Sequence, residues 1–240
     1  MAVFTPRTCC LMIPRTASTW VRDAIRAARP QTRYGRSWYW ETSPKHRPFN
    51  PRGGVNDPQG RNWAGQTIYC FVRHPVTWLR SRWCLGPWDD GPMHVGDKFT
   101  AIWCDSFPAF VSAYLTQMPG EIGRYFEKYV CECTTTGKQE TALEDLIRIL
   151  RDAGETFDEP EIRNLTPTNF SEQYPDYAAG QAEAVCDAEA ATLEKFGYTR
   201  EWSDELVYRT QERIVQDYLA SGPDVPDAVR NALSSILAGA

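Results

Sequence analysis

Two short apolar runs in the first third of the chain predict buried strands. Residues 8–13 and 67–72 are almost continuously apolar, and the first run lies between Pro6 and Pro14. Unbroken apolar runs of this length are typical of parallel strands that are covered on both faces. The pattern therefore predicts a parallel sheet with helices packed against it.

Helical spacing follows each of these runs. After the first, apolar residues recur from Val21 to Ala28 until Pro30 stops the pattern, and after the second Pro75 fits the first turn of a helix. The other expected elements are helices over 106–118 (capped by Asp105), between Thr141 and Gly154 (with a capping box to Glu144), and over 175–196, 203–220 and 226–238, and strands near 37–41 and 128–133. The expected fold class is α/β, with a parallel β-sheet flanked by helices.

Size and composition favour one globular unit. The chain has 240 residues, 42% of them hydrophobic, and nine tryptophans, which is enough to bury a large core. We expect residues 1–200 to form the α/β domain and residues 201–240 to form a helical extension packed on it. The apolar stripes of that extension need a partner surface, within the chain or in a second copy, so the pattern is compatible with a homodimer.

No segment predicts a membrane span or a secretion signal. No apolar run approaches the roughly 20 residues that cross a bilayer, and the first strand starts too early for a signal peptide. The eight cysteines are scattered, as reduced core thiols are. The expected location is therefore cytoplasmic.

Charge is divided unevenly along the chain. The net charge is −5, yet residues 1–85 hold 14 Lys and Arg against 3 Asp and Glu, whereas residues 86–240 hold 12 against 28. This asymmetry predicts that the N-terminal part binds a polyanionic ligand. The acidic remainder is unsuited to wrapping nucleic acid.

The turn that follows the first run, residues 14–20, has the composition of an anion site. A strand, a turn of small residues and a helix start aim free backbone N–H groups at one point, where the helix dipole adds positive potential. Ala17 permits close approach of the backbone, and the hydroxyls of Thr16, Ser18 and Thr19 are further donors.

A second polar pair follows the second run. Arg73 ends that strand, and Ser81 lies about two turns into the next helix. Open α/β sheets bind ligands at the C-terminal ends of their strands. Arg73 and Ser81 are therefore candidate ligand-binding residues, and a structural ion pair is the alternative role for Arg73.

These two segments, PRTASTW and VRHPVTWLRSRW, resemble the sulfotransferase family that uses 3′-phosphoadenosine 5′-phosphosulfate (PAPS). KHRPF at 45–49 and EAATLEKFGY at 189–198 are also similar to family segments, so the resemblance covers roughly residues 8–198. It implies a P-loop-like sulfotransferase architecture, closest in pattern to bacterial and glycan-modifying members.

The resemblance also implies how the cofactor is held. The turn would hold the 5′-phosphosulfate, through Arg15, Thr16, Ala17, Ser18 and Thr19. Arg73 and Ser81 would hold the 3′-phosphate. Trp20 would stack on the adenine, and a place in the core is an equal alternative for this side chain.

The implied reaction transfers the sulfuryl group to a hydroxyl of a small molecule or a glycan and leaves 3′,5′-phosphoadenosine. Where most family members have Lys, this chain has Arg15, which keeps the positive charge but cannot release a proton. Lys45 is the candidate to supply an ammonium instead. His46 is the candidate base, selected by the Lys-His resemblance, and Glu41 is the alternative.

Other functions stay open at this point. Arg15 is compatible with a catalytically inactive protein that binds PAPS or another polyanion. A P-loop kinase is a weaker alternative, because no Gly-Lys-Ser/Thr follows a Gly-rich turn. No metal is expected, because Cys131 and Cys133 lack a second ligand pair. The acceptor pocket is expected between segments 31–49 and 83–104 and the 105–118 helix, with Trp38, Trp40, Trp88 and Trp103 as candidate walls.

Overall fold

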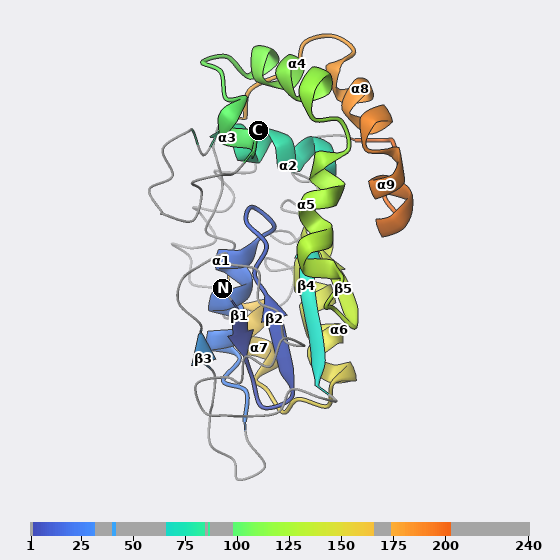
Figure 1. The fold of residues 1–240 in the computed structure, drawn as a ribbon. Coiled ribbons are helices and arrows are strands. Elements are labelled where there is room, and N and C mark those ends of the chain that lie inside the picture. Colours follow the sequence, from blue (N-terminus) through green and yellow to red (C-terminus); the bar gives the residue numbers. More distant parts are fainter. Residues whose placement is uncertain are drawn as a thin grey trace, which may run out of the picture. The chain divides into compact units, whose positions relative to one another are not determined.

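The structure is a computed structural model, and it describes residues 2–31, 66–84, 86, 98–165 and 174–202, together with the backbone of residues 40–41. The chain divides into two compact units, Met1–Arg200 and Glu201–Ala240. The expected helices over 203–220 and 226–238 lie outside the described residues, so the packing of the extension on the domain stays a prediction. The elements below all belong to the first unit (Figure 1).

The first unit contains a five-stranded sheet in the order β3-β1-β2-β4-β5. Its strands are β1 (Ala2–Phe4), β2 (Thr8–Leu11), β3 (Trp40–Glu41), β4 (Thr67–Val72) and β5 (Thr135–Lys138). The strands β2, β4 and β5 pair in parallel, whereas β1 is antiparallel to both β2 and β3. The expected α/β class is confirmed. The sheet was expected to be parallel, but it is mixed, because β1 and β3 join the parallel strands β2, β4 and β5 through antiparallel pairing.

The register of β2 and β4 decides where the site residues emerge. Cys10 pairs with Tyr69 and Leu11 pairs with Cys70, so the two strands end side by side. The turn after β2 and Arg73 after β4 therefore leave the sheet at the same edge (Figure 1). This is the edge at which open α/β sheets bind ligands.

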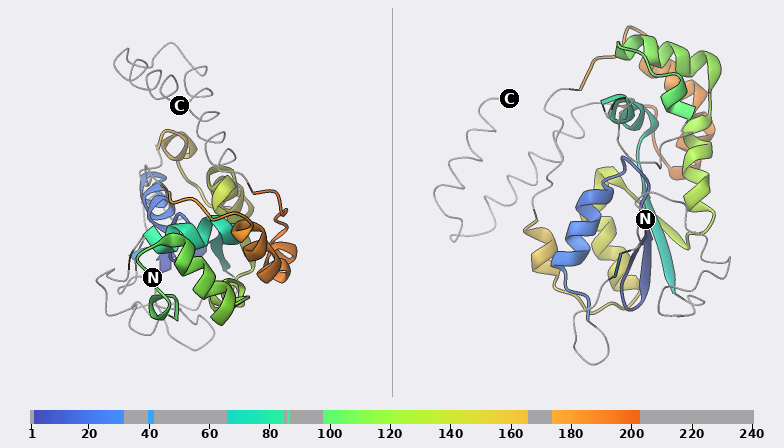
Figure 2. Two further views of the ribbon diagram at one scale, coloured as in Figure 1. Left: turned by 90° about the horizontal axis from the view of Figure 1, so that it is seen from above. Right: turned by 60° about the vertical axis from the view of Figure 1, so that its left-hand side comes forward.

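One face of the sheet is covered by three helices, α1 (Ser18–Ala27), α6 (Ala142–Asp152) and α7 (Glu159–Arg163), as Figure 2 shows in its right-hand view. Their apolar sides form a single buried cluster with the strands. The cluster includes Val3, Cys10, Met12, Trp20, Val21, Ala24, Ile25, Tyr69, Phe71, Leu146, Ile147, Leu150 and Ile162. Burial of this apolar surface is the main term that favours the fold.

The remaining helices surround α2 (Pro75–Cys84). They are α3 (Lys98–Ala101), α4 (Phe107–Gln117), α5 (Glu121–Val130), α8 (Gln181–Ala188) and α9 (Ala190–Phe196). Trp78 of α2 is 1% exposed and packs edge-on against Phe99 at 5.0 Å and Phe126 at 5.8 Å between ring centroids. These aromatic contacts fix α2 above the ends of β2 and β4.

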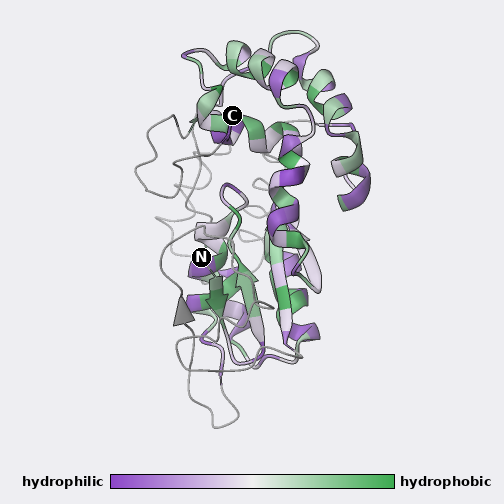
Figure 3. Ribbon diagram, viewed as in Figure 1, coloured by the Kyte–Doolittle hydropathy of each residue, from purple (hydrophilic) through white to green (hydrophobic). Residues whose placement is uncertain are grey.

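The predicted strand at 128–133 is wrong. Residues up to Val130 complete α5, whose buried side chains Ile122, Phe126 and Tyr129 recur every three to four residues, as the alternating hydropathy of α5 indicates (Figure 3). The strand comes later, as β5, and its sequence Thr-Thr-Gly-Lys has no apolar run because it pairs with only one neighbour in the described sheet.

Several predicted boundaries are also corrected. The helix expected over 175–196 starts at Gln181, after Gly180 with φ +76°, and is interrupted at Glu189. Asp105 is not the cap of α4, whose N-cap residue is Ser106. Thr141 is the N-cap residue of α6, as expected, but its hydroxyl donates to Asp145 at 2.7 Å and makes no capping bond to the backbone. The short strand expected near 37–41 is described only as β3, and β1 was not predicted.

Across the part of the chain that the structure describes, we find no helix long and apolar enough to cross a membrane.

Candidate functional site

The turn between β2 and α1 has an unusual backbone. Arg15 and Ala17 adopt φ values of +66° and +61°, a left-handed conformation that non-glycine residues rarely take. No side chain of the described residues caps α1, and the first backbone bond of this helix runs from the Val21 N–H to the Ala17 carbonyl at 2.9 Å. The N–H groups of the first helical turn therefore have no partner within the helix. Strain of this kind is common where a turn holds a ligand.

Three hydrogen bonds join this turn to Arg73 and α2, although 58 to 66 residues separate the partners. Arg15 Nε donates to Ser81 Oγ at 2.9 Å, and Arg73 Nη1 donates to the Arg15 carbonyl at 3.3 Å. Arg73 Nε donates to Thr77 Oγ1 at 3.0 Å, and Trp78 Nε1 donates to the Pro14 carbonyl at 3.0 Å. The structure thus brings Arg15, Arg73 and Ser81 into one cluster.

The charge of Arg73 is buried, and no carboxylate of the described residues pairs with it directly. Arg73 is 5% exposed, and no carboxylate of residues 2–31, 66–84, 98–165 or 174–202 lies within 4.0 Å of its guanidinium. Its contacts are a hydroxyl, a carbonyl and the ring of Tyr174. Buried charges are normally paired, so this guanidinium has the environment of an anion-binding group.

The exposed thiol of Cys84 lies near the same cluster, at the end of α2. Burial raises the pKa of this thiol. The nearby guanidiniums of Arg15, Arg80 and Arg73 favour the thiolate and partly oppose this rise. Three cations therefore act on one point at the C-terminal end of α2. Arg80 was not among the site residues predicted from the sequence. Its position directly before Ser81, on the helix that follows Arg73, is the signal that could have indicated it.

His74 has a structural role beside the cluster. Its Nδ1 accepts the Val76 N–H at 3.3 Å, so the proton is on Nε2, which donates to the Thr199 carbonyl at 3.2 Å. The His74 N–H in turn donates to Glu140 at 2.8 Å. Burial lowers the pKa of His74, which keeps the ring neutral and fixes the start of α2.

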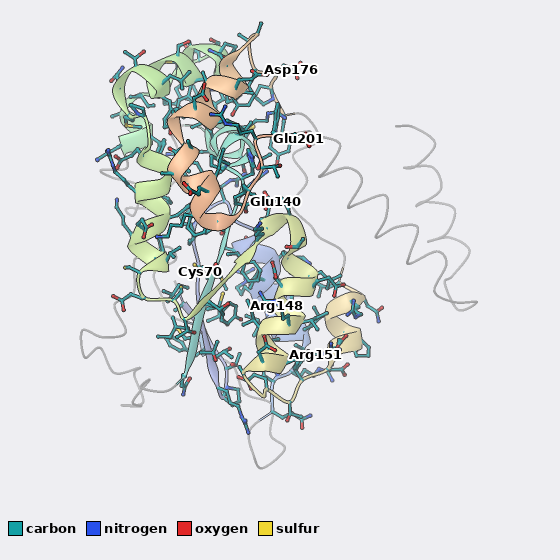
Figure 4. All side chains as sticks on the ribbon, turned by 90° about the vertical axis from the view of Figure 1, so that its right-hand side faces the viewer. Cys70, Glu140, Arg148, Arg151, Asp176 and Glu201 are labelled. Atoms are coloured by element: carbon teal, nitrogen blue, oxygen red, sulfur yellow. The ribbon has the colours of Figure 1, made fainter. Side chains whose placement is uncertain are left out.

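Figure 4 labels Glu140, which connects this corner to the end of α9. Its carboxylate accepts the Tyr198 hydroxyl at 2.9 Å in addition to the His74 N–H. The residue that follows Arg73 is therefore held by a network of three elements. Such a network holds the Arg73 backbone in one position.

The other predicted residues of the turn are placed as follows. Ser18 and Thr19 are half-buried in the first turn of α1. Thr16 is 1% exposed and its hydroxyl donates to the Ile13 carbonyl at 3.0 Å, so its single proton is used inside the turn. Trp20 is 6% exposed, belongs to the core cluster and donates to the Leu165 carbonyl at 3.4 Å, which favours its core role over stacking on an adenine.

The candidates for catalysis other than Arg15 belong to segments outside the described side chains. Lys45 and His46 lie outside the described residues, as do Trp38 and Trp88, and only the backbone of Trp40 and Glu41 is described. Of the expected acceptor walls, Trp103 lies parallel to Trp83 with ring centroids 6.4 Å apart. The described side chains contain no group of three or more His, Cys, Asp or Glu that could hold a metal ion.

Comparison of the chain with protein-family models, with curated proteins and with solved structures finds no match in any of the three.

Proposed function

We propose that the protein is a sulfotransferase that transfers the sulfuryl group of PAPS to a hydroxyl acceptor. The observation that best supports this proposal is the hydrogen-bonded cluster of Arg15, Ser81 and Arg73, which lies at the ends of two adjacent parallel strands. PAPS carries a 5′-phosphosulfate and a separate 3′-phosphate. A ligand with two anionic ends suits a helix N-terminus and a buried guanidinium that lie next to each other.

Each group has a distinct part in the proposed reaction. The acceptor oxygen attacks sulfur, and the bond between sulfur and the phosphate oxygen breaks, so the electron pair leaves on the phosphate of 3′,5′-phosphoadenosine. Arg15 and the N–H groups at the start of α1 stabilise the charge that develops there. The acceptor proton passes to a base, for which His46 is the candidate and Glu41 the alternative. Lys45 would add an ammonium on the leaving-group side.

The proposed architecture is the P-loop-like sulfotransferase fold, and the proposed acceptors are glycans or small molecules with a free hydroxyl. A cytoplasmic location is part of the same proposal, because PAPS and a reduced set of cysteines are compatible there. No step in this chemistry requires a metal ion.

A direct assay tests the activity. The protein is incubated with PAPS, EDTA and a panel of glycans and phenols, and the expected result is release of 3′,5′-phosphoadenosine with a product heavier by one SO₃ group. His46→Ala should lower kcat while the affinity for 3′,5′-phosphoadenosine is kept. An absolute requirement for ATP and Mg²⁺ would favour a kinase instead.

The second candidate is a protein that binds PAPS without turnover, and Arg15 in the place of Lys favours it. In that case 3′,5′-phosphoadenosine stabilises the protein against heat, because a ligand that binds only the folded state raises its stability, but no acceptor is modified.

Alkylation of cysteine tests the place of binding for both candidates. Cys84 and Cys131 are exposed thiols, and only Cys84 lies beside the arginine cluster. We expect 3′,5′-phosphoadenosine to slow the reaction of Cys84 with iodoacetamide, measured by peptide mass spectrometry, and to leave Cys131 as the internal control unchanged. Equal labelling with and without saturating ligand would exclude the cluster as the site.

A further inference from the structure

One face of α2 is polar although it is turned inward. Thr77, Arg80, Ser81 and Cys84 stand at positions i, i+3, i+4 and i+7, which places them on one side of a helix. Thr77, Arg80 and Ser81 are only 5%, 3% and 1% exposed. A buried helix face normally carries apolar side chains, so this face has a purpose other than packing.

The guanidinium of Arg80 lies close to two tyrosine rings. Its Cζ lies 5.3 Å from the ring centroid of Tyr177 and 5.9 Å from that of Tyr174. The Tyr177 hydroxyl donates to the Val76 carbonyl at 2.7 Å, which ties the ring to the first turn of α2. A planar guanidinium packed on aromatic rings keeps a defined orientation, which an ammonium would not.

The same ring links Arg80 to the cluster already described. The Cζ of Arg73 lies 6.0 Å from the centroid of Tyr174, so the guanidiniums of Arg73 and Arg80 lie against one ring. The neighbour of Arg80 in sequence, Ser81, accepts the hydrogen bond from Arg15. Three guanidiniums therefore surround the polar face of α2.

We propose that Arg80 is a ligand-binding residue: together with Arg73 it holds the second anionic group of the ligand, while Arg15 and the start of α1 hold the first. The inference rests on the proposed function and deepens it, because it assigns the preference for a nucleoside bisphosphate over a monophosphate to the Arg73–Arg80 pair. Two forks on one anionic group offer more charge-assisted hydrogen bonds than the single arginine expected from the sequence.

Binding measurements on the full chain test this assignment. Adenosine 3′,5′-bisphosphate, which is the 3′,5′-phosphoadenosine named above, and adenosine 5′-monophosphate are titrated calorimetrically into the unsubstituted protein and into the Arg80→Lys and Arg82→Lys variants. We expect Arg80→Lys to weaken bisphosphate binding about tenfold or more, because lysine keeps the charge but loses the fork and the ring contacts, and to change monophosphate binding by less than about twofold.

Arg82→Lys is a matched control from the same helix. Arg82 is also 3% exposed, but it donates to Thr100 Oγ1 at 2.9 Å and to the Gly86 carbonyl at 3.3 Å, away from the polar face. Equal losses in both variants would overturn the assignment in favour of a structural role. If Arg80→Lys fails to fold, Tyr174→Leu removes the shared ring and should lower the preference for the bisphosphate in the same direction.

The outcomes separate this inference from the proposed function. Unchanged bisphosphate preference in Arg80→Lys would overturn the role of Arg80 and leave the sulfotransferase proposal standing. Failure of the unsubstituted protein to bind either nucleotide would overturn both.

Discussion

Two buried charges in this protein are treated in opposite ways. Glu189, between α8 and α9, is 1% exposed, and four donors satisfy its carboxylate: the Tyr114 hydroxyl, the Ile122 N–H at 3.0 Å, the Gly123 N–H at 3.0 Å and the Thr192 hydroxyl at 2.6 Å. Arg73 is 5% exposed and uses Nε and Nη1 on neutral groups of the described chain. A guanidinium has five N–H donors, so Arg73 has further donors with which it could bind an anionic ligand.

The difference separates a structural charge from a binding charge. Glu189 neutralises the start of α5 and connects it to α4 and α9, so its partners are complete within the chain. The backbone even makes room for this contact, because a Cβ at Gly123 would lie 2.1 Å from Thr192 Oγ1. The described residues give Arg73 no such complete set of partners, and substitutions at the two places should therefore affect different properties.

The largest effect is expected on the structural side. Glu189→Ala leaves the start of α5, Tyr114 and Thr192 without their acceptor, and we expect the free energy of unfolding to fall by roughly 3–5 kcal/mol in urea denaturation. Glu183→Ala, an exposed carboxylate on α8, is the control and should change it by less than about 0.5 kcal/mol. Similar stabilities of the two variants would contradict the structural role.

Arg73 should show the reverse behaviour. Arg73→Ala should weaken binding of adenosine 3′,5′-bisphosphate about 100-fold, which corresponds to about 2.8 kcal/mol, and alter the free energy of unfolding by about 1 kcal/mol or less. Arg148→Ala on α6 is the control, because Arg148 is an exposed arginine paired with Asp145 at 2.9 Å (Figure 4). A large fall in the free energy of unfolding with unchanged affinity in the folded variant would contradict the binding role of Arg73.

A smaller effect is expected in the turn itself. Ala17→Gly relieves the left-handed conformation at φ +61° and should raise the free energy of unfolding by about 1 kcal/mol. In the middle of α4, where the backbone is helical, Ala113→Gly should lower it by about the same amount. A destabilised Ala17→Gly variant would show that the turn is not strained.

The smallest effect concerns His74, whose partners are complete like those of Glu189. Because burial lowers its pKa below the ordinary value of 6.5, the unfolded chain binds more protons than the folded one as the pH falls below 6.5. The contribution of neutral His74 to the stability of the folded state is complete above pH 6.5. It is lost as the pH falls from 6.5 to the pKa of His74 in the folded protein. Glu140, Arg73 and Tyr198 face the ring.

His74→Asn isolates this contribution, because asparagine can accept the Val76 N–H without titrating. We expect a flatter dependence of stability on pH between 7 and 5, by about 1 kcal/mol or less, measured by urea denaturation. An unchanged slope would assign the dependence to the carboxylates instead.

Features with a local signal could be predicted from the amino-acid sequence. The runs that became β2 and β4, the helices that follow them and the turn at 14–17 were predictable, because burial on both faces gives an apolar run and a helix repeats every 3.6 residues. The stretch at 128–133 misled for the same reason: a short apolar segment can belong to a strand or to the end of an amphipathic helix.

Contacts between residues far apart in the chain could not be predicted in this way, because they depend on how the elements pack. The contact between Arg15 and Ser81 depends on the parallel register of β2 and β4, and the place of β1 depends on sheet pairing that no local pattern encodes. The roles of Arg80 and Glu189 likewise depend on residues that are distant in the sequence. A charged side chain looks alike in sequence whether it faces water, a complete set of donors or a neighbouring cation, because its energy is set by the groups that folding brings around it.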